Sequence, residues 1–283
     1  MRTLISAAEL ADLMRSPAPP VLLDCRFDLV DTGAGERAYA EGHLPGARYL
    51  HLDRDLSGPR HDADGRFRGR HPLPDRAAWA AAVGRLGIAP GVSVVAYDAQ
   101  GGPYAARAWW MLRWLGHDAV AVLDGGVAAW RAAGGALETA VPAPAPRPPY
   151  PAPEPAMPVI DADALLARLG RVCVLDARAG ERFRGEVEPL DRVAGHVPGA
   201  LHRFFQDNLQ PDGRFKSAAQ LRAELAPLVA GCAPLDVVQQ CGSGVTACHN
   251  LLALEHAGLG TTVLYPGSWS EWSADPARPI AVG

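Results

Sequence analysis

Gly42-His-Leu-Pro-Gly-Ala47 and Gly195-His-Val-Pro-Gly-Ala200 are near-copies of one another, one in each half of the 283-residue chain. A second pair precedes them in the same order: Leu22-Leu-Asp-Cys-Arg26 returns as Val174-Leu-Asp-Ala-Arg178. Because the order and the approximate spacing of the copies are kept, an internal duplication is the simplest explanation.

The regions around these motifs indicate the type of fold. Short runs rich in β-branched residues alternate with segments rich in alanine and leucine at helical spacing. Such alternation is typical of parallel sheets covered by helices. We therefore predict an α/β protein with two tandem domains, each a parallel sheet flanked by helices. The runs expected to form strands are Val21–Leu23, Val92–Tyr97, Val172–Leu175, Val237–Val238 and Thr261–Tyr265.

A proline-rich stretch separates the two halves. Residues 140–158 read AVPAPAPRPPYPAPEPAMP, a composition that prevents helix and sheet formation and favours extended polyproline conformation. The predicted organisation is a first domain over residues 1–139, a semi-rigid linker over 140–158 and a second domain over 159–283.

Composition excludes several classes of protein. The chain is 48% hydrophobic and 20% charged with a net charge of −4, and it has neither a long apolar segment nor a basic stripe, so neither a membrane nor a nucleic acid is expected as a partner. The N-terminus lacks an apolar export segment, which predicts a cytoplasmic location. The five cysteines show no C-x-x-C or zinc-like spacing, so we predict neither a disulfide nor a metal site. Nothing in the sequence calls for a cofactor.

Cys241 is the candidate nucleophile. When the halves are superposed, Val237–Cys241 falls opposite Val94–Asp98, each a hydrophobic strand that leads into a glycine-containing loop and a helix. A cysteine just before a helix N-terminus is exposed to the positive end of the helix dipole, which lowers a thiol pKa and favours the reactive thiolate. The alternative is a buried, inert cysteine, the usual fate of a free thiol.

Two other loop chemistries fit parts of this segment. Gly242–Ala247 matches the dinucleotide pattern G-x-G-x-x-A, but the following strand, Thr261–Tyr265, has no acidic residue at its tip to bind a ribose. A cysteine phosphatase would need an arginine six residues after the cysteine, where this chain has Ala247.

The repeated motifs, the linker and a loop cysteine found only in the second half resemble the tandem-domain rhodanese-like sulfurtransferases. The loop Cys241-Gly-Ser-Gly-Val-Thr246 is similar to that of the 3-mercaptopyruvate sulfurtransferase type, whereas thiosulfate sulfurtransferases typically carry a charged C-R-K-G-V-T loop. The resemblance implies transfer of sulfur from 3-mercaptopyruvate through a Cys241 persulfide to a thiol, cyanide or thioredoxin-like acceptor, with release of pyruvate. A thiosulfate sulfurtransferase and a non-catalytic sulfur carrier are the alternatives.

The resemblance also implies roles for further residues. The loop N–H groups would stabilise the thiolate and the persulfide, and a relay of Asp53, His71 and Ser243 would assist proton transfer. Two arginines would bind the donor carboxylate, namely Arg182 and, at an offset register, Arg192. The predicted substrate-binding residues of the loop are Gly242, Gly244, Val245 and Thr246.

Overall fold

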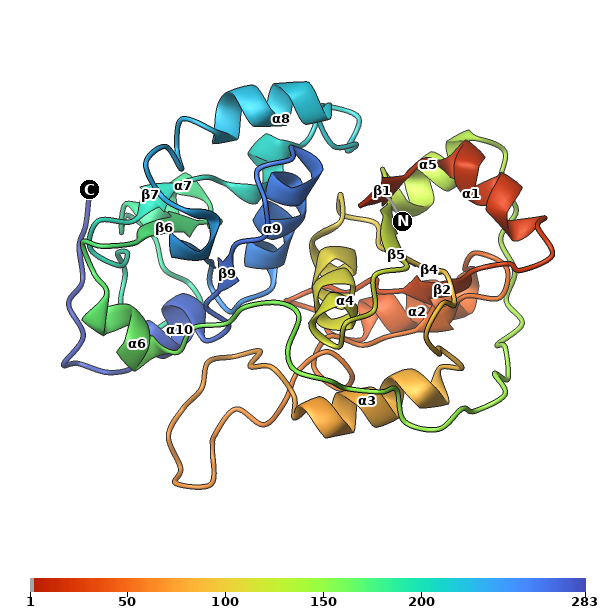
Figure 1. Ribbon diagram of the computed structural model, residues 1–283, viewed down its shortest axis with the longest axis horizontal. Helices are drawn as coiled ribbons and strands as arrows, with labels where there is room; N and C mark the ends of the chain where they lie inside the picture. The colour runs from red at the N-terminus through yellow and green to blue at the C-terminus, as the bar shows by residue number, and fades with distance from the viewer. Residues whose placement is uncertain (1–2) are drawn as a thin grey trace. The chain divides into compact units, whose positions relative to one another are not determined.

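The computed structural model describes residues 3–283 and divides them into two compact units (Figure 1). The first unit contains the chain up to Ser57, Pro74–Met157 and Pro211–Phe215. The second contains Gly58–Leu73, Pro158–Gln210 and Lys216–Gly283. Each half of the sequence thus contributes one segment to the unit that the other half mainly forms. The repeat pattern does not reveal this exchange.

The first unit is built on a five-stranded parallel sheet in the order β1-β5-β4-β2-β3. Its three central strands are buried at every residue, as expected for a parallel sheet covered on both faces. The strands are β1 (Leu4–Ile5), β2 (Val21–Asp24), β3 (Arg48–Tyr49), β4 (Val94–Tyr97) and β5 (Val120–Leu123). The helices are α1 (Ala7–Met14), α2 (Ala34–Glu41), α3 (Arg76–Arg85), α4 (Pro103–Trp114) and α5 (Gly126–Ala132).

The second unit repeats this plan with a four-stranded parallel sheet in the order β7-β6-β8-β9. Val159 forms a single parallel bridge to Leu264, in the place that β1 takes in the first unit. The strands are β6 (Cys173–Asp176), β7 (Leu201–His202), β8 (Val237–Gln240) and β9 (Val263–Leu264). The helices are α6 (Ala162–Ala167), α7 (Gly180–Phe183), η1 (Phe205–Asn208), α8 (Ala218–Leu225), η2 (Pro234–Asp236), α9 (Thr246–His256) and α10 (Ser268–Trp272). The predicted fold is confirmed.

The repeated sequence motifs make the same contacts in both units. Arg26 pairs with Asp24 at 2.6 Å and donates to the Gly42 carbonyl at 2.8 Å. Arg178 pairs with Asp176 and donates to the Gly195 carbonyl, both at 2.7 Å. These buried pairs tie the end of a central strand to the G-H-x-P-G-A turn, which explains why the two motifs recur together.

The histidine of each G-H-x-P-G-A motif is buried and bonded to the main chain. The Nδ1 atoms of His43 and His196 lie 2.8 Å from the carbonyls of Tyr39 and Phe183 respectively. Each imidazole also stacks on the ring of that same aromatic residue, at centroid distances of 3.9 and 4.0 Å. Equivalent packing in both units indicates a structural role for the two histidines.

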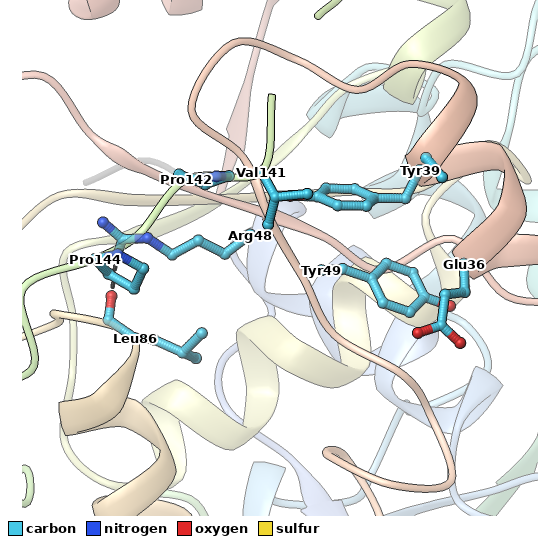
Figure 2. A pocket seen from close by; sticks show the side chains of 9 residues that line it. Glu36, Tyr39, Arg48, Tyr49, Leu86, Val141, Pro142 and Pro144 are labelled. Carbon is cyan, nitrogen blue, oxygen red and sulfur yellow. Dashed lines mark hydrogen bonds between the residues drawn. The ribbon is translucent and has the colours of Figure 1, made fainter. Parts of the chain in front are cut away.

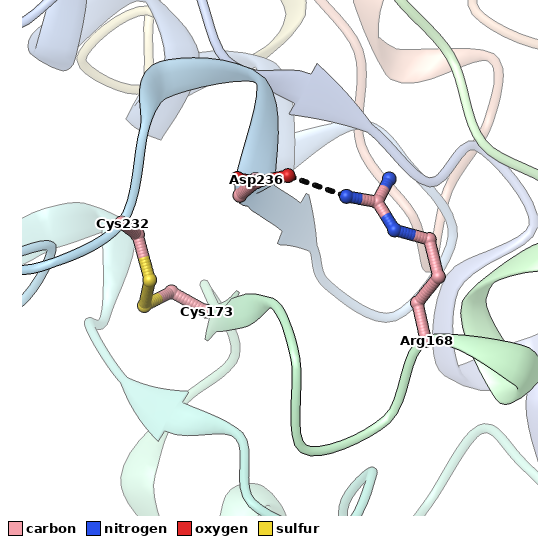
Figure 3. The surroundings of a disulfide bond; sticks show 4 residues. All are labelled: Arg168, Cys173, Cys232 and Asp236. Atoms are coloured by element: carbon pink, nitrogen blue, oxygen red, sulfur yellow. Dashed lines mark hydrogen bonds and ion pairs between the residues drawn. A yellow bond between two sulfur atoms is a disulfide. The ribbon is translucent and has the colours of Figure 1, made fainter.

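The expectation of no disulfide is wrong. Cys173, the first residue of β6, is bonded to Cys232 (Figure 3). The register of the sheet explains the pairing: Cys173 lies opposite Val237, so the turn just before β8 passes the start of β6. A sequence separation of 59 residues conceals this proximity.

The described helices are short. The longest, α4 and α9, have 12 and 11 residues, and about 20 apolar residues are needed to cross a bilayer. No helix within residues 3–283 is long and apolar enough to span a membrane.

Candidate active site

Cys241 lies in the loop between β8 and the first turn of α9, and its side chain is buried. Its Sγ atom accepts hydrogen bonds from the backbone N–H of Gly244 at 3.1 Å and of Ser243 at 3.4 Å. Gly244 has a φ of +77°, and a Cβ atom there would lie 2.3 Å from the Pro266 carbonyl. Glycine is therefore required for the loop to turn its N–H groups towards the sulfur.

The rest of the loop leads into the N-terminus of α9. Val245 precedes this helix and Thr246 is its first residue, and no side chain caps the helix. The positive end of the helix dipole therefore faces the loop that holds the sulfur, which favours a negative charge there.

The start of α10 anchors the Cys241 loop. The Cys241 N–H donates to Ser268 Oγ at 3.1 Å, and its carbonyl accepts from Trp269 N at 2.9 Å. Ser268 has a φ of +51°, the only positive value among the non-glycine residues that the structure describes. Such backbone strain costs about 1–3 kcal/mol and clusters at functional sites. The sequence reasoning did not identify Ser268, although Gly126 holds the matching position in the first repeat.

His71 and Ser243 lie within hydrogen-bond distance of one another. His71 Nδ1 lies 2.7 Å from Ser243 Oγ, and both side chains are buried. The two residues are 172 positions apart, and they meet because Gly58–Leu73 belongs to the second unit. Asp53 belongs to the first unit, where its backbone N–H donates to His51 Nδ1 at 3.1 Å. Its part in the relay stays a prediction.

Two guanidinium groups lie beside the cysteine loop. Arg182, in α7, bonds through Nη2 to Glu188 at 2.7 Å and to Asp191 at 3.1 Å. Arg70 also pairs with Asp191. A Cβ atom on Gly242 would lie 2.8 Å from Nη2 of Arg70 and 3.4 Å from Nη1 of Arg182. Both groups therefore border the residue that directly follows Cys241.

Of these two arginines, only Arg182 was expected from the sequence. Arg192 is exposed, and it has no hydrogen bond or ion pair within the part of the chain that the structure describes. Its binding role stays a prediction. Arg70 directly precedes His71, so the segment that supplies the expected histidine also supplies an unexpected arginine.

The acidic side chains beside these arginines are buried. Asp191 and Glu188 each expose 4% of their side chains. Burial raises the pKa of Asp191, and the charge of Arg70 opposes that rise. Asp191 therefore depends on Arg70 and Arg182 to carry a negative charge in this position.

The two other cysteines outside the disulfide are poorly placed for catalysis. Burial, followed by the charge of Asp24, raises the pKa of Cys25 well above that of an ordinary thiol, which disfavours the thiolate. Cys248 is also buried, and its Sγ donates to the Gly244 carbonyl at 3.4 Å. Both thiols act in packing.

A separate cavity of about 480 Å³ lies in the first unit (Figure 2). Its wall is mostly apolar, and it contains no cysteine. Arg48 extends along it and donates to the Leu86 carbonyl, and burial lowers the pKa of Arg48. The lining residues are Glu36, Tyr39, Ala40, Arg48, Tyr49, Leu86, Val141, Pro142 and Pro144.

Known proteins share this architecture. The chain is 48% identical over 283 residues to a probable 3-mercaptopyruvate sulfurtransferase of Pseudomonas aeruginosa, covering 99% of this chain and 98% of that one. It is 43% identical to a putative thiosulfate sulfurtransferase, SseB, of Mycobacterium tuberculosis, covering 100% and 98%. It is 37% identical to human 3-mercaptopyruvate sulfurtransferase, covering 100% and 96%.

Solved structures agree with these sequence comparisons. The 3-mercaptopyruvate sulfurtransferase of Leishmania major superposes with a TM-score of 0.85 at 32% identity, covering 99% of this chain and 76% of that one. SseA of Escherichia coli, described as a 3-mercaptopyruvate sulfotransferase, gives 0.77 at 29% identity, covering 95% and 100%. The rhodanese-like domain family matches residues 6–133 and 161–275. The chain therefore belongs to the rhodanese-like family, with two tandem copies of its domain, and the prediction of a sulfurtransferase is confirmed.

Proposed function

We propose that this protein transfers sulfur from 3-mercaptopyruvate through a Cys241 persulfide to a thiophilic acceptor and releases pyruvate. The observation that carries the proposal is the Cys241 sulfur itself, which accepts N–H groups from Ser243 and Gly244 beside the N-terminus of α9. A thiolate held this way is a nucleophile without any metal or cofactor.

The first half-reaction follows from this geometry. The thiolate attacks the donor sulfur, an S–S bond forms, and the C–S bond breaks with its electron pair left on carbon as an enolate. Protonation of the enolate gives pyruvate. We propose that the bonded pair of His71 and Ser243 supplies that proton. Asp53 completes the proposed relay.

The loop is proposed to stabilise the persulfide as it stabilises the thiolate. The stretch from Gly242 through Gly244 and Val245 to Thr246 connects Cys241 to α9, and the N–H groups of Ser243 and Gly244 within it donate to the sulfur. Fixed N–H donors stabilise a developing negative charge because they need no reorganisation during the reaction. The outer sulfur is then passed to a thiol, cyanide or a reduced thioredoxin-like protein.

Substrate binding requires a cation for the donor carboxylate. We propose Arg182 for this role, since its guanidinium group borders Gly242 next to the nucleophile. The second arginine expected from the family pattern, Arg192, is retained as a candidate although its side chain is exposed.

Thiosulfate is the second candidate donor, and one observation favours it. The loop lacks the arginine and lysine of the thiosulfate type, yet Arg70 and Arg182 bring two positive charges to the same place from outside the loop. A dianion could be held there. The relative from M. tuberculosis carries the thiosulfate name.

The cytoplasmic location expected from the sequence is kept as a proposal. The Cys173–Cys232 disulfide bears on it, because disulfides in reducing compartments are uncommon and are often redox-active. Alkylation and mass analysis of the protein recovered from separated cell fractions would report both its compartment and the state of this pair.

Donor titration tests the proposed function. Purified protein is treated with 3-mercaptopyruvate or thiosulfate, and released pyruvate or sulfite and intact mass are recorded, with Cys241→Ser as the control. We expect one added sulfur and rapid pyruvate release, both absent in the variant. Faster turnover of thiosulfate would establish the second candidate. If neither donor adds sulfur, Cys241 is not a sulfur-transfer nucleophile, and a carrier loaded by another enzyme becomes the better description.

A further inference from the structure

The cavity of the first unit contains an arginine that no acidic side chain balances. Arg48 begins the edge strand β3, and its side chain is half-buried. Within residues 3–283 no carboxylate forms an ion pair with it. Glu36, the acidic residue that lines the cavity, pairs with Arg54 at 2.9 Å instead. Burial lowers the pKa of Arg48, as expected for a cation that leaves water without an anionic partner.

The open side of the Arg48 guanidinium group has the geometry that binds a carboxylate. Its Nε atom is buried, and neither Nε nor Nη2 has a hydrogen-bond partner in the described part of the chain. Nε and Nη2 are also the atoms through which Arg26 holds Asp24. Arg178 holds Asp176 in the same way. A carboxylate at Arg48 would therefore receive the same parallel pair of N–H groups.

The fold does not require an arginine at this position. Leu201 takes the matching place in the second unit, because each residue directly follows a G-H-x-P-G-A motif and begins an edge strand. Arg48 does donate through Nη1 to the carbonyl of Leu86, the residue that ends α3, and such a contact stabilises a helix C-terminus. That contact uses one of the three nitrogens and leaves the other two for a ligand.

One wall of the cavity comes from the proline-rich segment, which is held at both ends. His43 Nε2 lies 3.2 Å from the Ala140 carbonyl. The Arg147 N–H donates to the Gly84 carbonyl in α3 at 2.9 Å. Wall residues 141–144 lie between these two anchors. The wall is therefore fixed by the fold of the first unit, which favours a preformed site.

The rest of the cavity suits an aromatic ring. The rings of Tyr39 and Tyr49 lie 5.4 Å apart between centroids, at an angle of 38°. Both hydroxyls already donate to backbone carbonyls, so the rings offer the cavity apolar surface. Figure 2 shows the Arg48 guanidinium group beside Leu86 and Pro144, with the two tyrosine rings farther along the cavity. A volume of about 480 Å³ is in the usual range for a small-molecule site.

We propose that this cavity binds a small aromatic monocarboxylate, with the carboxylate on Nε and Nη2 of Arg48 and the ring against Tyr39, Tyr49 and the proline-rich wall. The site is separate from Cys241, since all of its lining residues belong to the first unit. Binding there does not depend on the proposed sulfur transfer and is measured without a sulfur donor.

Titration with phenylacetate tests the proposal, and phenylacetamide is the neutral analogue of nearly the same shape. In methyl-labelled protein, the NMR signals of Leu86 and Val141 report both the affinity and the place of binding. We expect phenylacetate to shift these signals with a Kd at least about tenfold below that of phenylacetamide, because the amide lacks the charge and the second acceptor oxygen.

Substitution of Arg48 tests the role of its fork. Arg48→Leu introduces the residue of the second repeat and should raise the Kd of phenylacetate at least about tenfold, with little effect on phenylacetamide. Arg85→Gln is the matched control, because Arg85 is an exposed arginine next to Leu86 that does not line the cavity. It should bind phenylacetate like wild type.

The results decide the proposal in each case. It is overturned if millimolar phenylacetate and indole-3-acetate both leave the Leu86 and Val141 signals of wild type unchanged, or if Arg48→Leu binds phenylacetate as wild type does. Shifts confined to Val245, beside the Cys241 loop, would place the ligand at the sulfur-transfer site and also overturn it. Should Arg48→Leu fail to fold, Arg48→Gln gives the answer, because its amide can still donate to the Leu86 carbonyl.

Discussion

The Cys241 loop and the Asp98 loop are two versions of one structure with different contents. Each follows a central strand, and each is followed by a helix that begins five residues later, at Pro103 or Thr246. Three residues after Asp98 or Cys241, each loop has a glycine with a positive φ, +83° at Gly101 and +77° at Gly244. The backbone path is therefore shared where the loop turns.

The difference lies in what occupies the loop. The Asp98 carboxylate accepts four backbone N–H groups at 2.9–3.0 Å, two on each oxygen. Complete burial raises the pKa of Asp98, and the N–H groups oppose that rise. Among residues 3–283, two backbone N–H groups donate to the Cys241 sulfur. The first loop is thus filled by a buried carboxylate, whereas the second holds a sulfur that accepts fewer N–H groups.

The largest effect is expected when aspartate, the residue that the first loop has at position 98, replaces Cys241 in the second loop. Cys241→Asp should abolish sulfur transfer, a loss of at least about 10³-fold, because the nucleophile is gone. Its free energy of unfolding should stay within about 1 kcal/mol of wild type, since a carboxylate can accept the same N–H groups. Pyruvate release and chemical denaturation measure the two results.

Cys241→Ala is the matched control, because it removes the sulfur without supplying an anion. If Cys241→Asp is far less stable than Cys241→Ala, the second loop does not accept a carboxylate, and the comparison with Asp98 fails for this site.

The disulfide offers the next largest effect. Val21 and Ile88 occupy the places in the first repeat that Cys173 and Cys232 occupy in the second, and both are buried. The double change Cys173→Val with Cys232→Ile should lower the free energy of unfolding by about 2–4 kcal/mol, because the unfolded chain regains the freedom of a 59-residue loop. Sulfur transfer should be unchanged.

Denaturant titration under oxidising and reducing conditions measures this decrease in the free energy of unfolding. Reducing agent should destabilise wild type but not the double variant. Equal stability of the two proteins under oxidising conditions would show that the apolar pair of the first repeat replaces the disulfide fully.

The smallest effect is expected at Ser268, whose counterpart in the first repeat is Gly126, with φ values of +51° and +56°. Ser268→Gly relieves strain of about 1 kcal/mol but removes the acceptor for the Cys241 N–H, worth a similar amount. Stability should therefore change little, while the rate of persulfide formation falls about threefold to tenfold because the loop is less firmly held.

Ser268→Ala separates the two contributions, since it keeps the strain and loses the acceptor. It should be less stable than Ser268→Gly by about 1 kcal/mol. Persulfide formation at the wild-type rate in both variants would mean that Ser268 has no part in positioning Cys241.

The sequence by itself determined the features that depend on local order. Strand and helix periodicity, the repeated motifs and a cysteine between a strand and a helix are properties of neighbouring residues, so they predicted two tandem parallel-sheet units and a thiolate loop. Local order also suffices to place Gly244 where a positive φ is needed. The relay partner His71 was reached only through family resemblance, because nothing near it in the chain marks it as catalytic.

Only the tertiary structure decided which distant residues meet that loop. Gly58–Leu73 joins the second unit and carries Arg70 and His71 to the loop, and sheet register brings Cys173 to Cys232. These proximities depend on the path of the chain across elements, which spacing does not encode. The proposed roles of Asp53 and Arg192 remain predictions for the same reason. A role that depends on a distant contact cannot be derived from residue type and position alone.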